Sequence, residues 1–296
     1  MEGGGCFFMK KRICAILCVA ATAVTAAVGW FLWGRGETAA VSGSVTEGAE
    51  TVELPAIMYH GLLKDPAYEG KYVISPAEWE SDLCYLKNNG YTPIHMEELY
   101  AWQDHGEALP EKPILLTFDD GYYNNYVYAW PLAKQYGMKF IISPIGSCTD
   151  RFTGANDDHA NYSHVTWPQI NEMMDSGLVE FQNHSYDLHG SKGRIGAKKL
   201  AGETEEQYRT LLTEDLRKLQ ERFQTETGTM PTVFAYPFGA ISDGSLEILW
   251  DMGFRAAFTC AGRVNVVSKT EEHPVLGRFL RPHGISSEQF FAKIFS

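Results

Sequence analysis

The run ILLTFDDG at residues 114–121 joins an unbroken apolar and β-branched segment to two adjacent carboxylates and a glycine. Such a run, ended by a turn signal, is typical of a strand buried on both faces in a parallel sheet. Side chains of neighbouring strand residues point to opposite faces, so Asp119 and Asp120 can serve different roles around one site. The sequence Asp-Asp-Gly is also common in ordinary turns, so this run alone does not distinguish a turn from a functional site.

Two further strand candidates end in a similar way. Residues 179–183 are followed by His184 and His189, and residues 233–236 are followed by Pro-Phe-Gly at 237–239. Two imidazoles five residues apart do not share a helix face, so they converge only if the chain curls after the strand. The carboxyl ends of parallel strands form the mouth where α/β barrels and open sheets hold their sites. We therefore expect one composite site.

Short apolar runs alternate with longer helix-compatible stretches from Leu54 to the C-terminus, without an internal repeat. Expected strands cover 54–59, 114–118, 139–143, 179–183, 233–236 and 255–259, and expected helices cover 76–89, 96–105, 125–136, 167–176, 203–227 and 244–252. Ser75, with Glu78 three residues later, predicts a capping box at the start of one helix. The pattern predicts the α/β class, as a distorted (β/α) barrel with mainly parallel strands.

The composition narrows the class of partner. The chain has 296 residues, 45% of them hydrophobic, which is enough to bury a sizeable core. Its formal net charge is −12. Proteins that bind phosphate backbones need a basic field, so this charge argues against a nucleic-acid partner.

The N-terminus predicts export. Three basic residues at 10–12 precede an uncharged stretch at 13–33, which has the roughly 20 residues that a helix needs to cross a bilayer. We expect a cytoplasmic tail at 1–12, a transmembrane signal-anchor at 13–33, a flexible linker at 34–53 and a catalytic domain at 54–296. This places the domain outside the cell membrane in a single-pass protein. The alternative is a cleaved signal peptide and a secreted domain.

One aspartate and two histidines form a ligand set suited to one divalent ion. Zn²⁺ is the default because such a set leaves positions open for water and substrate, and Ni²⁺ or Co²⁺ can occupy the same ligands. The ion would lower the pKa of bound water and polarise a carbonyl, and the second aspartate could act as a base.

Two motifs resemble one known family. TFDDG at 117–121 together with HSYDLH at 184–189 resembles the polysaccharide deacetylase superfamily, also called NodB-homology or carbohydrate esterase family four. LPAIMYH at 54–60 and FAYPFG at 234–239 are similar to the branch that deacetylates poly-β-1,6-N-acetylglucosamine, in which the motifs occur in permuted order. The resemblance extends from Pro55 to the C-terminus.

The resemblance implies a hydrolase that removes N-acetyl groups from an extracellular or cell-wall amino-sugar polysaccharide. Carried over position by position, it implies that Asp119 is the general base, that Asp120, His184 and His189 bind the metal, that His60 protonates the leaving amine, and that the backbone N–H of Phe238 holds the oxyanion.

One position departs from the family. Many members carry an arginine at the position of Ala235, where it pairs with the catalytic base. Arg278 or Arg281 could replace it, or both could be exposed charges on a terminal strand. His283, in the same segment, competes with His60 for the role of acid.

Two other functions remain open. One is a carbohydrate-binding protein of the same fold that keeps the metal but is weakly active or inactive. The other is a non-haem iron oxygenase, which also uses two histidines and one carboxylate but leaves the second aspartate without a role. Poly-N-acetylglucosamine, peptidoglycan, chitin fragments and acetylated xylan all remain candidate polymers.

Overall fold

The computed structural model describes residues 50–190 and 193–295. The expected tail, the transmembrane segment and most of the linker lie outside these residues. Within them, no helix is both long and apolar enough to cross a membrane.

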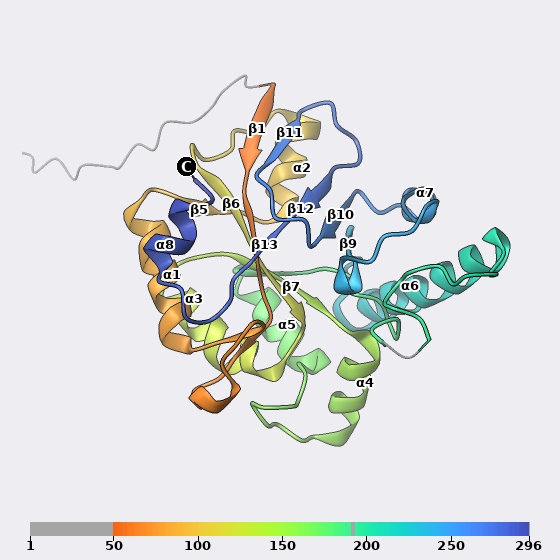
Figure 1. The fold of residues 1–296 in the computed structure, drawn as a ribbon, viewed down its shortest axis with the longest axis horizontal. Helices are drawn as coiled ribbons and strands as arrows, with labels where there is room; N and C mark the ends of the chain where they lie inside the picture. Colours follow the sequence, from red (N-terminus) through yellow and green to blue (C-terminus); the bar gives the residue numbers. More distant parts are fainter. Residues whose placement is uncertain (1–49, 191–192, 296) are drawn as a thin grey trace, which may run out of the picture. The chain divides into compact units, whose positions relative to one another are not determined.

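Parallel strands form the centre of the domain (Figure 1). One sheet has the order β13-β2-β6-β7-β8, with β5 also paired to β6, and a second has the order β12-β10-β9; every pairing in both is parallel. The bounds are β2 (Ala56–Tyr59), β5 (Thr92–Pro93), β6 (Pro113–Asp120), β7 (Phe140–Pro144), β8 (Val179–Phe181), β9 (Val233–Ala235), β10 (Ala256–Thr259), β12 (Val275–Gly277) and β13 (Phe279–Leu280).

The two sheets join at both ends. Asn183 forms a parallel bridge to Phe234, which links the end of β8 to β9. On the other side, only Arg278 separates β12 from β13 in the chain. The pairings therefore run round a ring, and the predicted α/β class with mainly parallel strands is confirmed.

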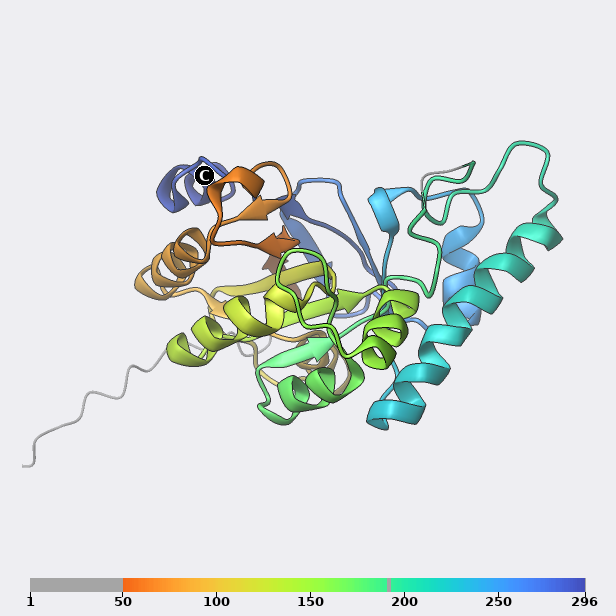
Figure 2. The same cartoon turned by 90° about the horizontal axis from the view of Figure 1, so that it is seen from below.

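Helices surround these strands (Figures 1 and 2). Their bounds are α1 (Pro76–Asn88), α2 (Met96–His105), α3 (Trp130–Tyr136), α4 (Gly146–Ala155), α5 (Trp167–Asp175), α6 (Glu205–Thr227), α7 (Ser245–Asp251) and α8 (Ser287–Ala292). The longest of them, α6, lies along one side of the domain in Figure 2. The predicted capping box at Ser75 and Glu78 is present at the start of α1.

The helix expected at 125–136 is divided in two. A π-helix, η2 (Asn125–Ala129), precedes α3, and Pro131 stands in the first turn of α3. Proline has no backbone N–H to donate, so the regular hydrogen-bond ladder is interrupted there. The carbonyl of Ala129, at the end of the π-helix, accepts a hydrogen bond from the indole of Trp79 at 3.1 Å.

The core packs against both faces of the sheet. All eight residues of β6 are buried, which accounts for its continuous apolar run. Trp79, on α1, packs its ring edge-on against Phe118, with ring centroids 5.1 Å apart. Burying an aromatic side chain of this size stabilises the fold by about 2–3 kcal/mol.

Several elements were not predicted. The expected strand at 54–59 is broken at Pro55 into β2 and a separate strand, β1 (Thr51–Leu54), which pairs antiparallel with β11 (Asn265–Ser268). The last residues assigned to the linker are therefore part of a strand, because β11 supplies a partner far away in sequence. Two short strands, β3 (Gly61–Leu62) and β4 (Val73–Ile74), pair beside the end of β2.

Candidate active site

The segments that follow β2, β6, β8 and β9 meet at one cavity of 510 Å³. Its walls include all six residues to which the sequence assigned a role, namely His60, Asp119, Asp120, His184, His189 and Phe238. The parallel arrangement explains this convergence, since the carboxyl ends of the strands open on the same side.

Three ligand-type side chains face one another in this cavity. Oδ1 of Asp120 lies 3.1 Å from Nε2 of His189 and 3.4 Å from Nε2 of His184. Nδ1 of His184 lies 2.7 Å from the carbonyl oxygen of Ala235. A carbonyl only accepts, so the neutral ring carries its proton on Nδ1 and turns the lone pair of Nε2 toward the carboxylate.

This arrangement fits a divalent cation. Oδ1 of Asp120 is buried and, among the described residues, has no hydrogen-bond donor. Two lone pairs that face each other in a buried site repel unless a positive charge lies between them. One carboxylate and two imidazoles are also the ligands that Zn²⁺ accepts, and they leave further positions open.

The backbone is strained at this site. Of the described residues other than glycine, four have positive φ: Asp120 (69°) and Phe238 (59°) line the cavity, and Ser185 (71°) directly follows His184 of its wall. The fourth, Asn156, ends α4. Such residues cost about 1–3 kcal/mol each and persist only where the surroundings hold them. The carbonyl of Asp120, for example, lies 2.9 Å from Nδ1 of His164.

The loop that carries both histidines is held by two polar side chains. The carboxylate of Asp215, on α6, accepts backbone hydrogen bonds from Tyr186 at 2.7 Å and from Asp187 at 2.8 Å. Oδ1 of Asn183 accepts from the N–H of Ser185 at 2.8 Å. Burial raises the pKa of Asp215 to about 6, against the lowering effect of the two N–H donors. These bonds produce the curl that brings the imidazoles together.

Asp119 is bound by a buried arginine. Nη1 of Arg278 lies 2.7 Å from Oδ1 of Asp119, and Nη2 lies 2.8 Å from Oδ2. Nη1 also donates to the hydroxyl of Thr117 and Nε to the carbonyl of Thr259. Burial would raise the pKa of Asp119, but the guanidinium outweighs it and holds that pKa below its usual value. Asp119 is therefore ionised and fixed in orientation.

His60 faces the same cavity from the end of β2. Its Nδ1 is buried and has no hydrogen-bond partner among the described residues. Its carbonyl accepts a hydrogen bond from Nδ2 of Asn125 at 2.8 Å, and its ring lies 4.8 Å from the ring of Tyr72. Burial lowers the pKa of His60, and the charges of Asp119 and Asp120 oppose this effect.

The family is decided by comparison with known proteins. The family profile described as "Polysaccharide deacetylase" matches residues 106–257. The chain belongs to this family. That match covers β6, which ends in both aspartates, and the loop with both histidines, so the geometry above is that of a deacetylase-family site.

Relatives and solved structures agree with this assignment. The chain is 25% identical over 258 residues to the poly-beta-1,6-N-acetyl-D-glucosamine N-deacetylase of Escherichia coli K12, covering 81% of this chain and 38% of that protein. The protein of the same name from Staphylococcus epidermidis is 24% identical over 188 residues, covering 64% of this chain and 61% of that one. The chain thus matches less than half the length of the E. coli relative.

Two solved structures share the fold. A de-N-acetylase from Aggregatibacter actinomycetemcomitans aligns with a TM-score of 0.68 at 25% identity, covering 81% of this chain and 98% of that one. IcaB from Ammonifex degensii aligns with a TM-score of 0.64 at 29% identity, covering 78% and 92%.

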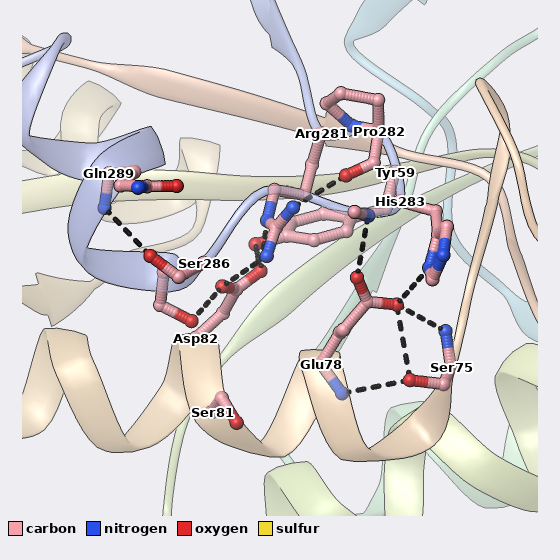
Figure 3. A network of polar contacts seen from close by, with 12 residues as sticks. Tyr59, Ser75, Glu78, Ser81, Asp82, Arg281, Pro282, His283, Ser286 and Gln289 are labelled. Carbon is pink, nitrogen blue, oxygen red and sulfur yellow. Dashed lines mark hydrogen bonds and ion pairs between the residues drawn. The ribbon is translucent and has the colours of Figure 1, made fainter.

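The arginine absent at Ala235 is replaced from another part of the chain. Arg278, between β12 and β13, forms the pair with Asp119, whereas Arg281 pairs with Asp82 on α1, with Nε 2.9 Å from Oδ2 (Figure 3). Both arginines are buried, so the expectation of exposed charges was wrong. This segment lies where the two sheets join, between β12 and β13, and its burial there could not be predicted from its position in the sequence.

His283 lies outside the cavity. Its Nδ1 is 3.0 Å from a carboxylate oxygen of Glu78 (Figure 3), and its Nε2 is 3.4 Å from a carboxylate oxygen of Glu69. It is partly exposed and does not line the wall that contains His60. Of the two histidines considered as acid, the structure places only His60 beside the aspartates.

Sequence reasoning missed several supporting residues of this site. His164, Asp215 and Asn125 fix the backbone of Asp120, the histidine loop and His60 respectively. His164 and Asp215 belong to no local motif, because each acts on a segment far away in the chain. Asn125 has a local signal, the pair Asn124-Asn125 shortly after the strand of the aspartates, and both side chains hold the segment after β2.

Proposed function

We propose that this chain is a metal-dependent hydrolase that removes N-acetyl groups from an extracellular or cell-wall amino-sugar polysaccharide. The observation that carries the proposal is the ionised, arginine-bound Asp119 next to the set of Asp120, His184 and His189 in one cavity. The relatives named as N-deacetylases of poly-β-1,6-N-acetylglucosamine support this class of polymer as the substrate.

Asp120, His184 and His189 would hold one divalent ion, with Zn²⁺ as the default and Ni²⁺ or Co²⁺ as alternatives. When bound, such an ion supplies a Lewis acid that polarises the acetamide carbonyl and lowers the pKa of the attacking water.

The chain's own residues supply the proton transfers. Asp119 accepts a proton from the attacking water, and Arg278 keeps the carboxylate ionised and oriented. The backbone N–H of Phe238 donates to the oxygen of the attacked carbonyl as it becomes negative. His60 donates a proton to the sugar nitrogen as the C–N bond breaks. The C–O bond to the water oxygen forms first and the C–N bond breaks afterwards, so the products are acetate and a free amine.

The two competing functions have less support. The suggestion of an inactive binder depended on the missing arginine, and Arg278 supplies a guanidinium at the same carboxylate. A non-haem iron oxygenase has no use for a second carboxylate held ionised beside the ligand set. The deacetylase proposal gives each of these groups a role.

We also propose that residues 13–33 anchor the enzyme in the cell membrane, with the catalytic domain outside. The basic residues at 10–12 and the long apolar run support this arrangement. Protease added to intact cells should digest the domain, and the mature protein should keep its N-terminus. A processed protein that begins beyond Ala27 would identify a cleaved signal peptide instead.

Acetate release tests the function directly. The detergent-purified full chain should release acetate from poly-β-1,6-N-acetylglucosamine and contain about one divalent ion per chain. Chelation should abolish release, and added Zn²⁺ or Co²⁺ should restore it. Peptidoglycan, chitin oligomers and acetylated xylan, assayed in parallel, identify the preferred polymer. Full activity in metal-free protein would refute the proposal.

A further inference from the structure

Two sulfur atoms lie close together in the wall of the catalytic cavity. Sγ of Cys260, directly after β10, is 3.9 Å from Sδ of Met58, on β2, and both residues line the cavity. Cys260 is exposed, whereas Met58 is buried. A thiol and a thioether are soft ligands, and in proteins such ligands select Cu(I) over harder ions.

The separation of the two sulfurs suits one shared ion. Zinc–thiolate bonds are about 2.3 Å long, and an ion at a similar distance from both sulfurs fits a separation of 3.9 Å. His60, two residues after Met58, lines the same cavity, and its buried Nδ1 has no hydrogen-bond partner among the described residues. Imidazole nitrogen also binds copper, so this cavity wall offers a third ligand.

The protonation of the thiol favours a metal over other reagents. Burial raises the pKa of Cys260, so near pH 7 the side chain is a neutral thiol. A neutral thiol is a poor nucleophile, and alkylating agents or peroxides react with it slowly. A soft ion instead displaces the proton: the S–H bond is exchanged for a sulfur–metal bond, and the proton passes to water.

The thiol lies against groups that have a role in the proposed reaction. A Cβ atom added to Gly239 would lie 2.9 Å from Sγ of Cys260, so the turn that carries the N–H of Phe238 packs against the thiol. Arg278, which binds Asp119, is near enough to oppose the rise in the pKa of Cys260. An ion bound to this thiol would therefore lie among the groups that move protons and hold the oxyanion.

We propose that Cys260 and Met58 form a binding site for Cu(I), with Nδ1 of His60 as a further ligand, and that the bound ion stops the reaction. The site shares no residue with the ligand set that contains Asp120. The loss of activity rests on the proposed deacetylase function, whereas the binding of Cu(I) does not.

Inhibition by Cu(I) tests the site. The detergent-purified full chain, first saturated with Zn²⁺, is assayed for acetate release without oxygen, while a Cu(I)-specific chelator sets the concentration of free Cu(I). We expect full inhibition of the wild type. Cys260→Ser should raise the half-inhibitory concentration by more than about 100-fold and Met58→Leu by about 10-fold, because each removes a ligand. Each variant is compared with its own rate without Cu(I).

Cys84→Ser provides the matched control. The thiol of Cys84 is half-buried on α1, lies 3.1 Å from the hydroxyl of Tyr136 and does not line the cavity. This variant should be inhibited at the same concentration of Cu(I) as the wild type. Thermal melting of each variant identifies any loss of the fold.

Absorption spectra give a readout that does not depend on turnover. Cu(I) thiolates absorb in the ultraviolet, so titration of the wild type with Cu(I) should produce a band for the tightest ion that Cys260→Ser lacks. Proton release on binding should fall in the same variant. The three cysteines at positions 6, 14 and 18 are present in every variant, so the difference between spectra isolates Cys260.

The outcomes separate the two proposals. If the wild type releases no acetate, the deacetylase proposal fails, and the spectra alone then test the site. An ion held tightly by the wild type and by Cys84→Ser but lost from Cys260→Ser supports the inference. Equal binding of Cu(I) by the wild type and Cys260→Ser overturns it. Met58→Leu that matches the wild type overturns it as well, because the site then lacks its second sulfur.

Discussion

Two buried arginines lie three residues apart on the segment that closes the ring of strands, and each pairs with an aspartate from another part of the chain. Arg278 binds Asp119 through two hydrogen bonds, and Arg281 binds Asp82 in the same manner. All four residues are at most 2% exposed. By type of residue and by burial, the two pairs are nearly equivalent.

Their surroundings differ. Asp82 also accepts a hydrogen bond from the hydroxyl of Tyr59 at 3.0 Å (Figure 3). It accepts another from the hydroxyl of Ser287 at 2.6 Å, so its oxygens face β2 and α8. Burial raises its pKa despite Arg281. Asp119 lies in the cavity wall, and Arg278 lowers its pKa against burial. The Arg281–Asp82 pair holds α1 to the closing segment, whereas the Arg278–Asp119 pair keeps a carboxylate ionised for its proposed role as a base.

The largest expected effect is on turnover. Asp119→Asn should lower the rate of acetate release by about 10²–10⁴-fold while the metal content stays near one ion per chain, because an amide cannot accept the proton of water. Asp120→Asn should instead weaken metal binding, and excess metal should partly restore its activity. If Asp119→Asn loses the metal and Asp120→Asn keeps it, the two roles are reversed.

The second effect is on stability. Asp82→Asn should lower the free energy of unfolding by about 3–5 kcal/mol, because it leaves the charge of Arg281 buried without its counterion. Per folded molecule, the rate of acetate release should stay close to that of the wild type. Denaturant unfolding and activity at low temperature give the two quantities.

A surface pair provides the control for Asp82. Asp104 and Arg255 form the same double hydrogen bond, but both side chains are partly exposed. Asp104→Asn should leave stability almost unchanged, since solvent screens exposed pairs. A similar loss in both variants would show that burial is not the cause.

The smallest effect concerns His283, two residues after Arg281 and partly exposed. Its hydrogen bond to Glu78 raises its pKa above the ordinary 6.5. Because the pKa of His283 is higher in the folded than in the unfolded state, protonation of His283 stabilises the fold. This stabilisation is complete at pH values below 6.5 and is lost as the pH rises through the pKa of the folded state.

His283→Ala should therefore lower the melting temperature by about 1–3 °C near pH 5.5 and have almost no effect near pH 9. Melting curves at both values measure this difference, with Glu78 left in place to keep the cap of α1. An equal loss at both values would show that the contact is not electrostatic.

Local patterns in the sequence were enough for the strand of Asp119 and Asp120, the histidine loop, the capping box at Ser75 and the α/β class. The first three are each encoded within about twenty consecutive residues, as an apolar run, a helical spacing or a turn signal, and the α/β class follows from the alternation of such runs from Leu54 onward. The helix at 96–105 has the predicted bounds for this reason.

Only the tertiary structure decided which arginine serves Asp119 and which histidine lies in the cavity. Arg278, Arg281 and His283 are close in sequence and alike in charge, and nothing local distinguishes them. Their roles depend on the place of β13 beside β2, which turns Arg278 into the ring of strands, Arg281 toward α1 and His283 to the surface. Strand pairing of this kind joins residues far apart in the chain, so no short stretch of sequence encodes it.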